Sequence, residues 1–335
     1  MNGFGKGGIP EYVKEFSSKE NIELLERFSS GNSGALVYKV RMAGKDAVLK
    51  IASEGKGLNE IRENLAGYEK IREARLGEIL PENVRVYENG GSTAIVMEYL
   101  GDSFYDRALK ENAPINLYKG LADAFGQLCE RTVRKDRESE RMLKEAKKNI
   151  HSKYEEFLLR EGYVNRRDIE LLDSVDTDAL SPDYSSFGCY DFTPEDVFLA
   201  NGRLKYPDPK QEVRGCPLIS LAAFAGVSRD SYGLPGSEEG YRVLENLAVE
   251  TLPHLLHIEP PKARKLFAFG RAMQLAISAK YRLKADPKKA RLFAARSVDY
   301  LNHILELSTS PAHAPPGGGE RQWKILDRMP SRCVR

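Results

Sequence analysis

The first hundred residues alternate between short β-forming runs and turns made of small and polar residues. From Ile22 the chain reads IELLERFSSGNSGALVYKVRMAGKDAVLKIAS, in which three runs rich in Val, Leu, Ile and Tyr flank turns at 29–34 and 43–46. Small residues separate β-strands because they tolerate the backbone angles that turns require. The pattern therefore predicts three consecutive strands joined by two turns.

A helix and a hairpin are predicted to follow these strands. Between residues 58 and 75, Ile61, Leu65 and Tyr68 recur at helical spacing. The stretch VRVYENGGSTAIVMEYL, residues 84–100, then reads as two strands around an ENGGS turn. Together these elements predict a small, mostly β unit over residues 21–101, preceded by an N-terminal extension, residues 1–20.

Beyond Gly101 the pattern changes to long helical stretches, with strand signals only at 197–199 and 204–206. This second unit, residues 102–309, is therefore expected to be mainly α, which gives an α+β fold overall. The tail, residues 310–335, contains PAHAPPGGG, a composition that cannot build a packed core, so we expect it to be flexible. The expected helices are 117–132, 135–161, 167–175, 218–227, 240–256, 263–283 and 288–305.

Composition and charge exclude several classes of protein. A chain of 335 residues with 41% hydrophobic residues can bury a sizeable core, and 51 basic against 49 acidic residues give no electrostatic reason to expect a nucleic-acid partner. The four cysteines show no paired CxxC spacing, so neither a disulfide framework nor a zinc site is indicated. No apolar run approaches the length of a membrane helix, and MNGFGKGG lacks the apolar core of a signal peptide. We expect a cytoplasmic protein without a membrane partner.

Three aspartates in one short segment point to chemistry. The stretch CYDFTPEDVFLANGRLKYPDPK contains Asp191, Asp196 and Asp208, separated by apolar residues and an Asn-Gly turn. That spacing would place them at the ends of two paired strands, an arrangement typical of metal sites. The alternative is that the three carboxylates lie on a solvated hairpin face.

A glycine-rich turn and a lysine offer a second candidate site. In SSGNSGALVYKV, Gly31 and Gly34 would let backbone N–H groups approach phosphate oxygens, although most such turns are plain hairpins. Lys50 lies among apolar residues in AVLKIA, where an unpaired ammonium is costly unless an anion faces it. The alternative for Lys50 is an edge-strand side chain that reaches solvent.

The order and spacing of these motifs resemble those of protein kinases. Asp191 and Asp196 reproduce the five-residue spacing between a catalytic-loop aspartate and a metal-binding residue, and a short hairpin carrying Asp208 follows. The chain is most similar, over residues 24–307, to the aminoglycoside phosphotransferase-like small-molecule kinases, which also include choline and homoserine kinases. The resemblance implies a bilobal protein-kinase-like fold, with a β-rich, nucleotide-binding N-lobe and a larger, mainly α C-lobe that carries the catalytic and acceptor-binding residues.

The sequence departs from the family pattern at several motif positions. Family members carry His-Gly-Asp with an Asn five residues after the Asp, whereas this chain has Cys189-Tyr190-Asp191 and an aspartate at 196. It also has Pro207 before Asp208, where the family has Ile-Asp. Asp-Phe-Gly, His-Arg-Asp and Ala-Pro-Glu motifs are absent, so the small-molecule branch is the closer match.

The resemblance implies roles for individual residues. Asp191 would orient the acceptor hydroxyl and take its proton, while Asp208 and Asp196 would hold Mg²⁺ that bridges the phosphates of ATP or GTP. Lys50 would contact the α- and β-phosphates. The turn over the phosphates would be formed by Gly31, Asn32, Ser33 and Gly34.

Two further assignments concern the partner of Lys50 and the adenine site. A glutamate of the following helix would pair with Lys50; we place Glu63 first, with Glu60 and Glu69 as alternatives. The segment VMEYL matches a kinase hinge, in which the backbones of Glu98 and Leu100 would pair with adenine; an ordinary buried strand is the alternative.

The resemblance also places acceptor contacts after Asp208. Glu212, Arg214 and the loop SRDSYGLPGSEEG, residues 228–240, lie where family members contact substrate, or they are solvated loop residues. The sequence thus predicts an ATP- or GTP- and Mg²⁺-dependent kinase for a small-molecule hydroxyl acceptor. The alternatives are a pseudokinase that binds nucleotide or a partner protein without turnover, and a protein kinase that lacks the usual activation segment. The acceptor and the oligomeric state stay open.

Overall fold

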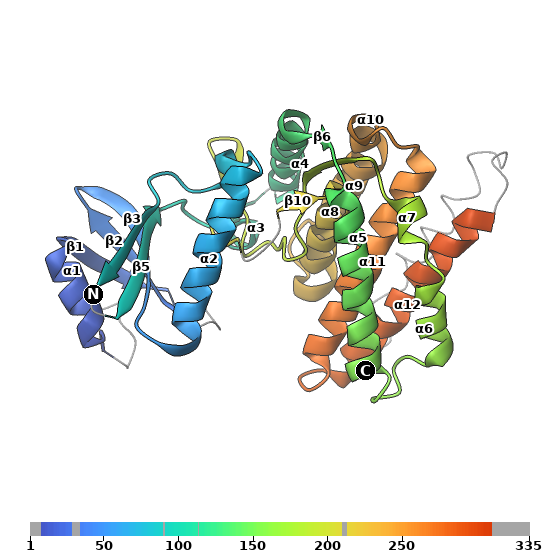
Figure 1. The fold of residues 1–335 in the computed structure, drawn as a ribbon, viewed down its shortest axis with the longest axis horizontal. Coiled ribbons are helices and arrows are strands. Elements are labelled where there is room, and N and C mark those ends of the chain that lie inside the picture. The colour runs from blue at the N-terminus through green and yellow to red at the C-terminus, as the bar shows by residue number, and fades with distance from the viewer. Residues whose placement is uncertain (1–7, 29–33, 90, 113, 210–212, 310–335) are drawn as a thin grey trace.

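The chain forms two lobes, one built on a β-sheet and one built from helices (Figure 1). A computed structural model describes residues 8–28, 34–89, 91–112, 114–209 and 213–309. The tail, residues 310–335, for which flexibility is expected, lies outside these described residues. The fold expected from the sequence, a β-rich N-lobe and a larger helical C-lobe, is confirmed.

The N-lobe contains a five-stranded antiparallel sheet in the order β1-β2-β3-β5-β4. The three expected strands and the expected hairpin are all present. The turn between β2 and β3 is shorter than expected, because the two strands are separated only by Ala43 and Gly44. The strands are β1 (Ile22–Arg27), β2 (Leu36–Met42), β3 (Lys45–Ala52), β4 (Arg85–Asn89) and β5 (Ser92–Glu98).

A helix packs on each face of this sheet. Side chains alternate along a strand, so Leu49 and Ile51 of β3 face α1 (Glu11–Lys19), whereas Lys50 points to the opposite face. That opposite face is covered by α2 (Gly55–Glu73), the expected charged helix. The N-terminal extension thus includes a helix that the sequence analysis did not anticipate.

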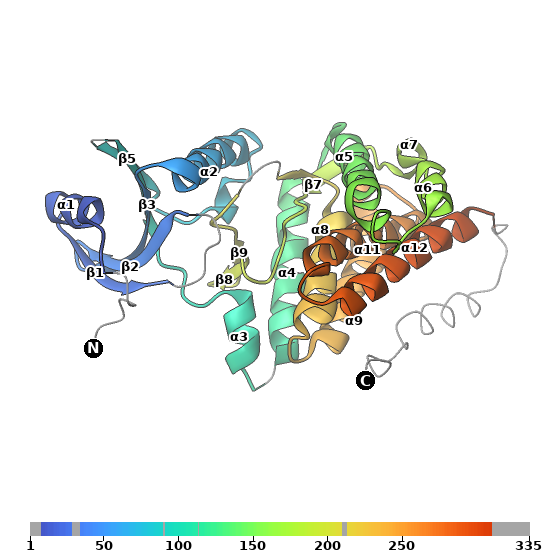
Figure 2. The same cartoon turned by 90° about the horizontal axis from the view of Figure 1, so that it is seen from below.

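The C-lobe is an assembly of helices around α8 and α11, in which α5, α6 and α7 lie on one side (Figure 2). All expected helices are present, but the stretch expected at 240–256 is divided into two helices by a π-helical turn, Leu247–Thr251. Two more π-helical turns, Tyr154–Leu158 and Val227–Tyr232, extend α5 and α8. A short 3₁₀ turn, Gly77–Ile79, lies before β4. The helices are α3 (Phe104–Lys110), α4 (Pro114–Thr132), α5 (Glu138–Lys153), α6 (Arg166–Asp173), α7 (Thr177–Leu180), α8 (Pro217–Gly226), α9 (Ser237–Asn246), α10 (Leu252–Leu256), α11 (Pro260–Arg282) and α12 (Pro287–Thr309).

Short strands in the C-lobe support the segment that carries the three aspartates. The expected hairpin is present as β8 (Phe198–Ala200) and β9 (Arg203–Lys205). A second small sheet, in the order β10-β7-β6, was not expected. Its strands β6 (Arg134–Lys135), β7 (Tyr184–Phe187) and β10 (Arg214–Gly215) are too short for hydrophobic alternation to reveal them.

A buried ion cluster occupies the loop that was expected to be solvated or to contact substrate. The Asp230 carboxylate accepts from Arg271 and lies 3.2 Å from Arg229 and 3.3 Å from Arg296. Burial by itself would raise the pKa of Asp230, but the charges of the three arginines outweigh it and lower the pKa to about 2. Asp230 therefore has a structural role in the C-lobe core.

In the part of the chain that the structure describes, no helix is long and apolar enough to cross a membrane. Three of the four cysteines lie within that part, and all three are buried free thiols: Cys129, Cys189 and Cys216.

Candidate functional site

The candidate site is centred on Lys50, whose side chain is 7% exposed beneath α2. An ammonium carries three donors, and three acceptors surround it within hydrogen-bond distance. They come from two separate segments, the first turns of α2 and the stretch after β9. The acceptors are Glu60 Oε1 at 2.6 Å, Asn64 Oδ1 at 2.7 Å and Asp208 Oδ1 at 3.1 Å.

The partner of Lys50 on α2 is Glu60, which corrects the first choice, Glu63. Glu60 is buried, whereas Glu63 and Glu69 are exposed. The physical reason is that the buried face of α2 includes polar positions, Glu60 and Asn64 among them, one helical turn apart. The apolar residues alone define too narrow a face to locate the glutamate.

Among the described residues, the charges in contact with Lys50 are not balanced. Two carboxylates, those of Glu60 and Asp208, face a single ammonium. In addition, the second oxygen of Glu60, Oε2, is buried and has no hydrogen-bond partner among the described residues. Because an uncompensated buried anion is costly, this excess negative charge favours a cation near Asp208.

Asp208 is placed beside Lys50 by close packing between its segment and α2. The Tyr68 hydroxyl donates to the Pro207 carbonyl at 2.7 Å. A Cβ atom on Gly67 would lie 2.2 Å from the Pro209 carbonyl oxygen, so only glycine permits this approach. Burial, followed by the charge of Asp208, raises the pKa of Tyr68, which keeps its hydroxyl protonated as a donor.

Asp191 lies in the loop between β7 and β8, with an exposed side chain. Main-chain contacts position this loop. The Cys189 N–H donates to Ser220 Oγ of α8 at 2.7 Å, and the Tyr206 hydroxyl donates to the Asp191 carbonyl at 3.3 Å. Among the described residues no hydrogen bond or ion pair reaches the Asp191 carboxylate. It is therefore free to accept a proton from a bound molecule.

The charges of Asp191 and Asp196 both affect two buried side chains, those of Cys189 and Tyr206. Burial raises the pKa of the Cys189 thiol to about 12, and the charges of both aspartates add to that increase. Burial also raises the pKa of Tyr206, where both carboxylates contribute again. The two aspartates thus lie on the same part of the loop, and the neutral Cys189 thiol is unsuited to act as a nucleophile.

Asp196 is oriented by a local turn. Its Oδ2 accepts from Thr193 Oγ1 at 2.7 Å, and its N–H donates to the Thr193 carbonyl at 3.1 Å. Backbone bonds from α3 to the same loop, Phe104 N–H to Val197 and Tyr105 N–H to Pro194, hold this turn against the C-lobe.

Asp208 has the exposure that a carboxylate ligand of a phosphate-bound magnesium ion requires. Within residues 8–309, where the structure describes them, no group of three or more His, Cys, Asp or Glu side chains gathers as a cage made of protein ligands alone. Mg²⁺ at phosphate sites uses one or two carboxylates and completes its shell with phosphate oxygens and water. Asp208 fits that requirement: its side chain is 28% exposed, and one oxygen accepts from Lys50.

The glycine turn is only partly described. Gly31, Asn32 and Ser33 lie outside the described residues, so their contact with phosphates stays a prediction. Gly34 has a positive φ of 92°. Its carbonyl would lie 2.6 Å from a Cβ on Gly57, so the end of the turn packs directly on the first turn of α2.

The expected adenine contacts differ between the two hinge residues. The Glu98 N–H donates to the Glu82 carbonyl at 3.2 Å, and Glu98 Oε2 accepts from the Glu82 N–H at 3.0 Å. A contact from Glu98 to adenine would therefore have to use its carbonyl. The Leu100 N–H has no partner among the described residues, which leaves it available.

Of the residues expected to contact the acceptor, Arg214 is placed in the interior of the protein. Glu212 lies outside the described residues. Arg214 is buried and bonds to backbone carbonyls, so it is not a solvated loop residue. Asn64, Tyr68, Tyr206 and Ser220, which the sequence analysis missed, orient the site; only Asn64 has a local signal, its one-turn spacing from Glu60.

Comparison with known proteins supports the fold. No family model matches the sequence, and no curated protein matches it. Among solved structures, aminoglycoside phosphotransferase APH(4)-Ia, in a ternary complex with ADP and hygromycin B, is 15% identical with a TM-score of 0.51, covering 89% of this chain and 99% of that one. Choline kinase from Cryptosporidium parvum Iowa II is 11% identical with a TM-score of 0.51, covering 89% and 95%. A candidate aminoglycoside phosphotransferase from Ralstonia eutropha JMP134 is 12% identical with a TM-score of 0.52, covering 89% and 97%. The chain therefore has the fold of these small-molecule kinases.

Proposed function

We propose that the protein is a phosphotransferase that uses ATP or GTP with Mg²⁺ and transfers the γ-phosphate to a hydroxyl of a small molecule. One observation carries the proposal: Lys50, Glu60 and Asp208 form a buried charged cluster under α2, while Asp191 presents a free carboxylate on the adjoining loop. Phosphoryl transfer needs positioning and charge neutralisation more than covalent chemistry from the protein.

In the proposed reaction, the Asp191 carboxylate takes the proton of the acceptor hydroxyl as that oxygen forms a bond to the γ-phosphorus. The bond between the γ-phosphorus and the bridging oxygen breaks, and the nucleoside diphosphate leaves with the electron pair. Asp208, with Asp196, would hold the Mg²⁺, which supplies charge neutralisation at the phosphates.

Lys50 would contact the α- and β-phosphates after a change of partners. Its three donors already match three protein acceptors, so a phosphate oxygen must replace one of them. Asp208 gives the longest of the three contacts and is the more exposed of the two carboxylates. We therefore propose that, when the nucleotide binds, the Asp208 carboxylate gives up its contact with Lys50 and binds Mg²⁺ instead.

The acceptor class follows from the solved structures that share the fold. APH(4)-Ia was solved with hygromycin B, and choline kinase is another of these structures. Polar small molecules that carry a hydroxyl are therefore the acceptors to test first.

Calorimetry and an acceptor screen test the proposal. Titration of ATP and GTP, each with and without Mg²⁺, is expected to show metal-dependent binding that is lost in Lys50→Met but kept in Lys119→Met, an exposed lysine of α4. A panel of hydroxylated metabolites and aminoglycosides is then screened for ADP release that depends on Asp191. No nucleotide binding to the folded wild type would overturn the proposal.

Nucleotide binding without turnover is the second candidate. It is supported by the aspartate at 196 and by the full set of protein acceptors around Lys50. Metal-dependent ATP binding with no ADP release on any acceptor, and no hydrolysis sensitive to Asp191→Asn, would favour this pseudokinase function.

A further inference from the structure

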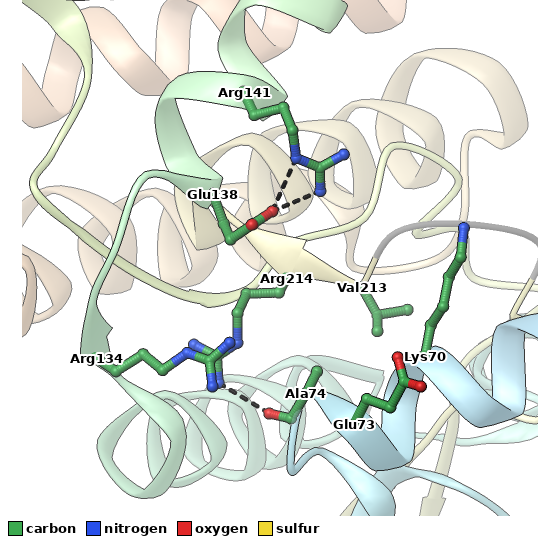
Figure 3. A pocket seen from close by; sticks show the side chains of 8 residues that line it. All are labelled: Lys70, Glu73, Ala74, Arg134, Glu138, Arg141, Val213 and Arg214. Carbon is green, nitrogen blue, oxygen red and sulfur yellow. Dashed lines mark hydrogen bonds and ion pairs between the residues drawn. The ribbon is translucent and has the colours of Figure 1, made fainter.

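A cavity of about 260 Å³ lies between the two lobes, and none of the proposed nucleotide-site residues lines it. Its walls are the last turn of α2, the strands β6 and β10, and the start of α5. Figure 3 shows four cationic side chains around it, two of them from the small sheet. The lining residues are Lys70, Glu73, Ala74, Arg134, Glu138, Arg141, Val213 and Arg214.

Arg214 is the most deeply buried of these cations. Its side chain is 6% exposed, and it donates to the carbonyls of Ala74 at 3.1 Å and Thr132 at 3.0 Å. A further contact goes to Ser185 Oγ at 3.2 Å. The remaining donor, Nε, is buried and has no partner among the described residues. Neutral acceptors therefore satisfy most of the hydrogen-bond donors of this guanidinium, but they do not cancel its charge.

Arg134 and Arg214 share one carboxylate. Asp136 Oδ2 lies 2.9 Å from Arg134 Nε and 3.8 Å from Arg214 Nη1. Two guanidiniums thus lie within 4 Å of a single oxygen, and burial together with the charge of Arg134 lowers the pKa of Arg214 more than Asp136 and Glu138 raise it. A buried cation of this kind is costly unless an anion approaches it.

The other carboxylates at the cavity compensate the charge of Arg214 only in part. Glu138 Oε2 accepts from Arg141 at 2.9 Å, and its charge also raises the pKa of Arg214. Glu73 is exposed on α2 and has Lys70 one turn before it on the same helix. Among the described residues at the cavity, four cationic side chains lie near three carboxylates, those of Glu73, Asp136 and Glu138.

We propose that this cavity binds a phosphate group, as inorganic phosphate or as a phosphate monoester, at the paired guanidiniums of Arg134 and Arg214. The small volume and charged walls suit a compact polar anion and not a large apolar ligand. Guanidinium forks match the geometry of phosphate oxygens, and the exposed Lys70 adds a positive charge to the lining of the cavity. The site is separate from the proposed nucleotide site.

Calorimetric titration of inorganic phosphate, at constant ionic strength against chloride, tests the proposal on the full chain. We expect saturable 1:1 binding. Arg134→Gln is expected to weaken it at least about tenfold, or about 1.4 kcal/mol, and Lys70→Gln to weaken it less. Arg166→Gln, an exposed arginine of α6 away from the cavity, is the matched control and should bind as the wild type does. We do not substitute Arg214, because its loss would leave the buried carbonyls of Ala74 and Thr132 without their donor.

Lys50→Met separates this site from the nucleotide site. Although Lys50→Met lowers stability, the protein that stays folded should bind phosphate as tightly as the wild type, whatever the effect on ATP. Loss of phosphate binding in Lys50→Met with no effect of Arg134→Gln would place the anion at the nucleotide site and overturn the proposal. No binding above the chloride background, or equal weakening by Arg166→Gln, would overturn it too. Titration of β-glycerophosphate distinguishes the two kinds of ligand. If β-glycerophosphate binds more tightly than inorganic phosphate, the ligand is a phosphorylated metabolite; if the two bind equally, the ligand is free phosphate.

Discussion

The Lys50 ammonium lies 3.1 Å from the Asp208 carboxylate, although 158 residues separate the two along the chain. This contact joins the N-lobe sheet to the segment after β9 in the C-lobe. Because Glu60 approaches the same ammonium from α2, the position of Lys50 depends on three elements at once. The stability of the N-lobe and the proposed nucleotide site therefore share the same residues.

Removal of Lys50 should destabilise the protein because two carboxylates would lose their counter-charge. Breaking a buried ion pair from one side costs about 3–5 kcal/mol. Lys50→Met is therefore expected to lower the free energy of unfolding by about that amount in urea denaturation, and adding Asp208→Asn should recover part of the loss. Lys119→Met, at an exposed position, should change stability by less than about 0.5 kcal/mol. Equal effects of the two lysine substitutions would show that the cluster contributes nothing to stability.

Gly67 and Gly120 offer a matched pair of substitutions within helices. A methyl group at 67 would lie 2.2 Å from the Pro209 carbonyl oxygen, whereas a methyl group at 120 would have a Leu199 methyl as its nearest neighbour, at 3.9 Å. Gly120→Ala should stabilise the protein by up to about 1 kcal/mol through helix propensity. Gly67→Ala should instead lower the melting temperature and weaken Mg²⁺-dependent ATP binding, because it displaces Asp208 from α2.

Calorimetry and thermal unfolding of both glycine variants check this difference. If Gly67→Ala proves as stable as Gly120→Ala and binds ATP as the wild type does, the contact between α2 and the Asp208 segment has no role in the site.

Local sequence patterns were sufficient for the strands of the N-lobe, for α2 and for most helices of the C-lobe, but not for α1. The strands β1 to β5 follow from runs of β-forming residues between turns, and α2 follows from three apolar residues at helical spacing. The same pattern placed Glu63 ahead of Glu60, because periodicity of apolar residues does not mark buried polar positions. Glu60 and Asn64 are buried because Lys50 lies opposite them, a tertiary contact with no local signal.

The remaining features depend on contacts between distant residues. The Tyr68 hydroxyl donates a hydrogen bond to the carbonyl of Pro207, 139 residues later, and no local sequence pattern near either residue predicts that contact. The strands β6, β7 and β10 contain two to four residues each, which is too few for alternation to be recognised. The spacing of Asp191, Asp196 and Asp208 was readable because a loop and a hairpin are local structures.

The Asp230 cluster predicts a loss of stability in acid. Burial opposes the charged form, but Arg271, Arg229 and Arg296 lower the pKa of Asp230 to about 2, below its value in an unfolded chain. The unfolded state therefore binds a proton first as the pH falls, so the stabilising contribution is fully present above about pH 4 and is lost toward about pH 2.

Asp230→Asn tests the origin of that acid sensitivity. It should lower the free energy of unfolding at neutral pH by about 3–5 kcal/mol, because three buried arginines lose their carboxylate. It should also flatten the dependence of stability on pH between about pH 4 and pH 2. Asp123→Asn, at an exposed position of α4, should leave both unchanged. A variant at 230 with the same acid profile as the wild type would assign the sensitivity to other groups.

The three aspartates should respond differently to removal of their charge. Asp191→Asn is expected to keep Mg²⁺-dependent ATP binding, since its carboxylate contacts neither Lys50 nor α2, while the rate of phosphoryl transfer falls at least about a hundredfold. Asp208→Asn should abolish metal-dependent nucleotide binding, because Mg²⁺ loses its main anionic ligand. Asp196→Asn places the residue usual in the resembling family, so it should fold, bind nucleotide and keep part of the activity.

Titration of Mg²⁺ against the three variants with ATP present separates these roles in one experiment. The wild type and Asp191→Asn should give matching Mg²⁺ affinities, Asp208→Asn should give none, and Asp196→Asn should lie between them because one carboxylate oxygen is replaced by a neutral one. Asp123→Asn controls for a general effect of charge. If all three variants bind Mg²⁺ and ATP as the wild type does, the carboxylates form a solvated hairpin face, and the phosphotransferase proposal fails with them.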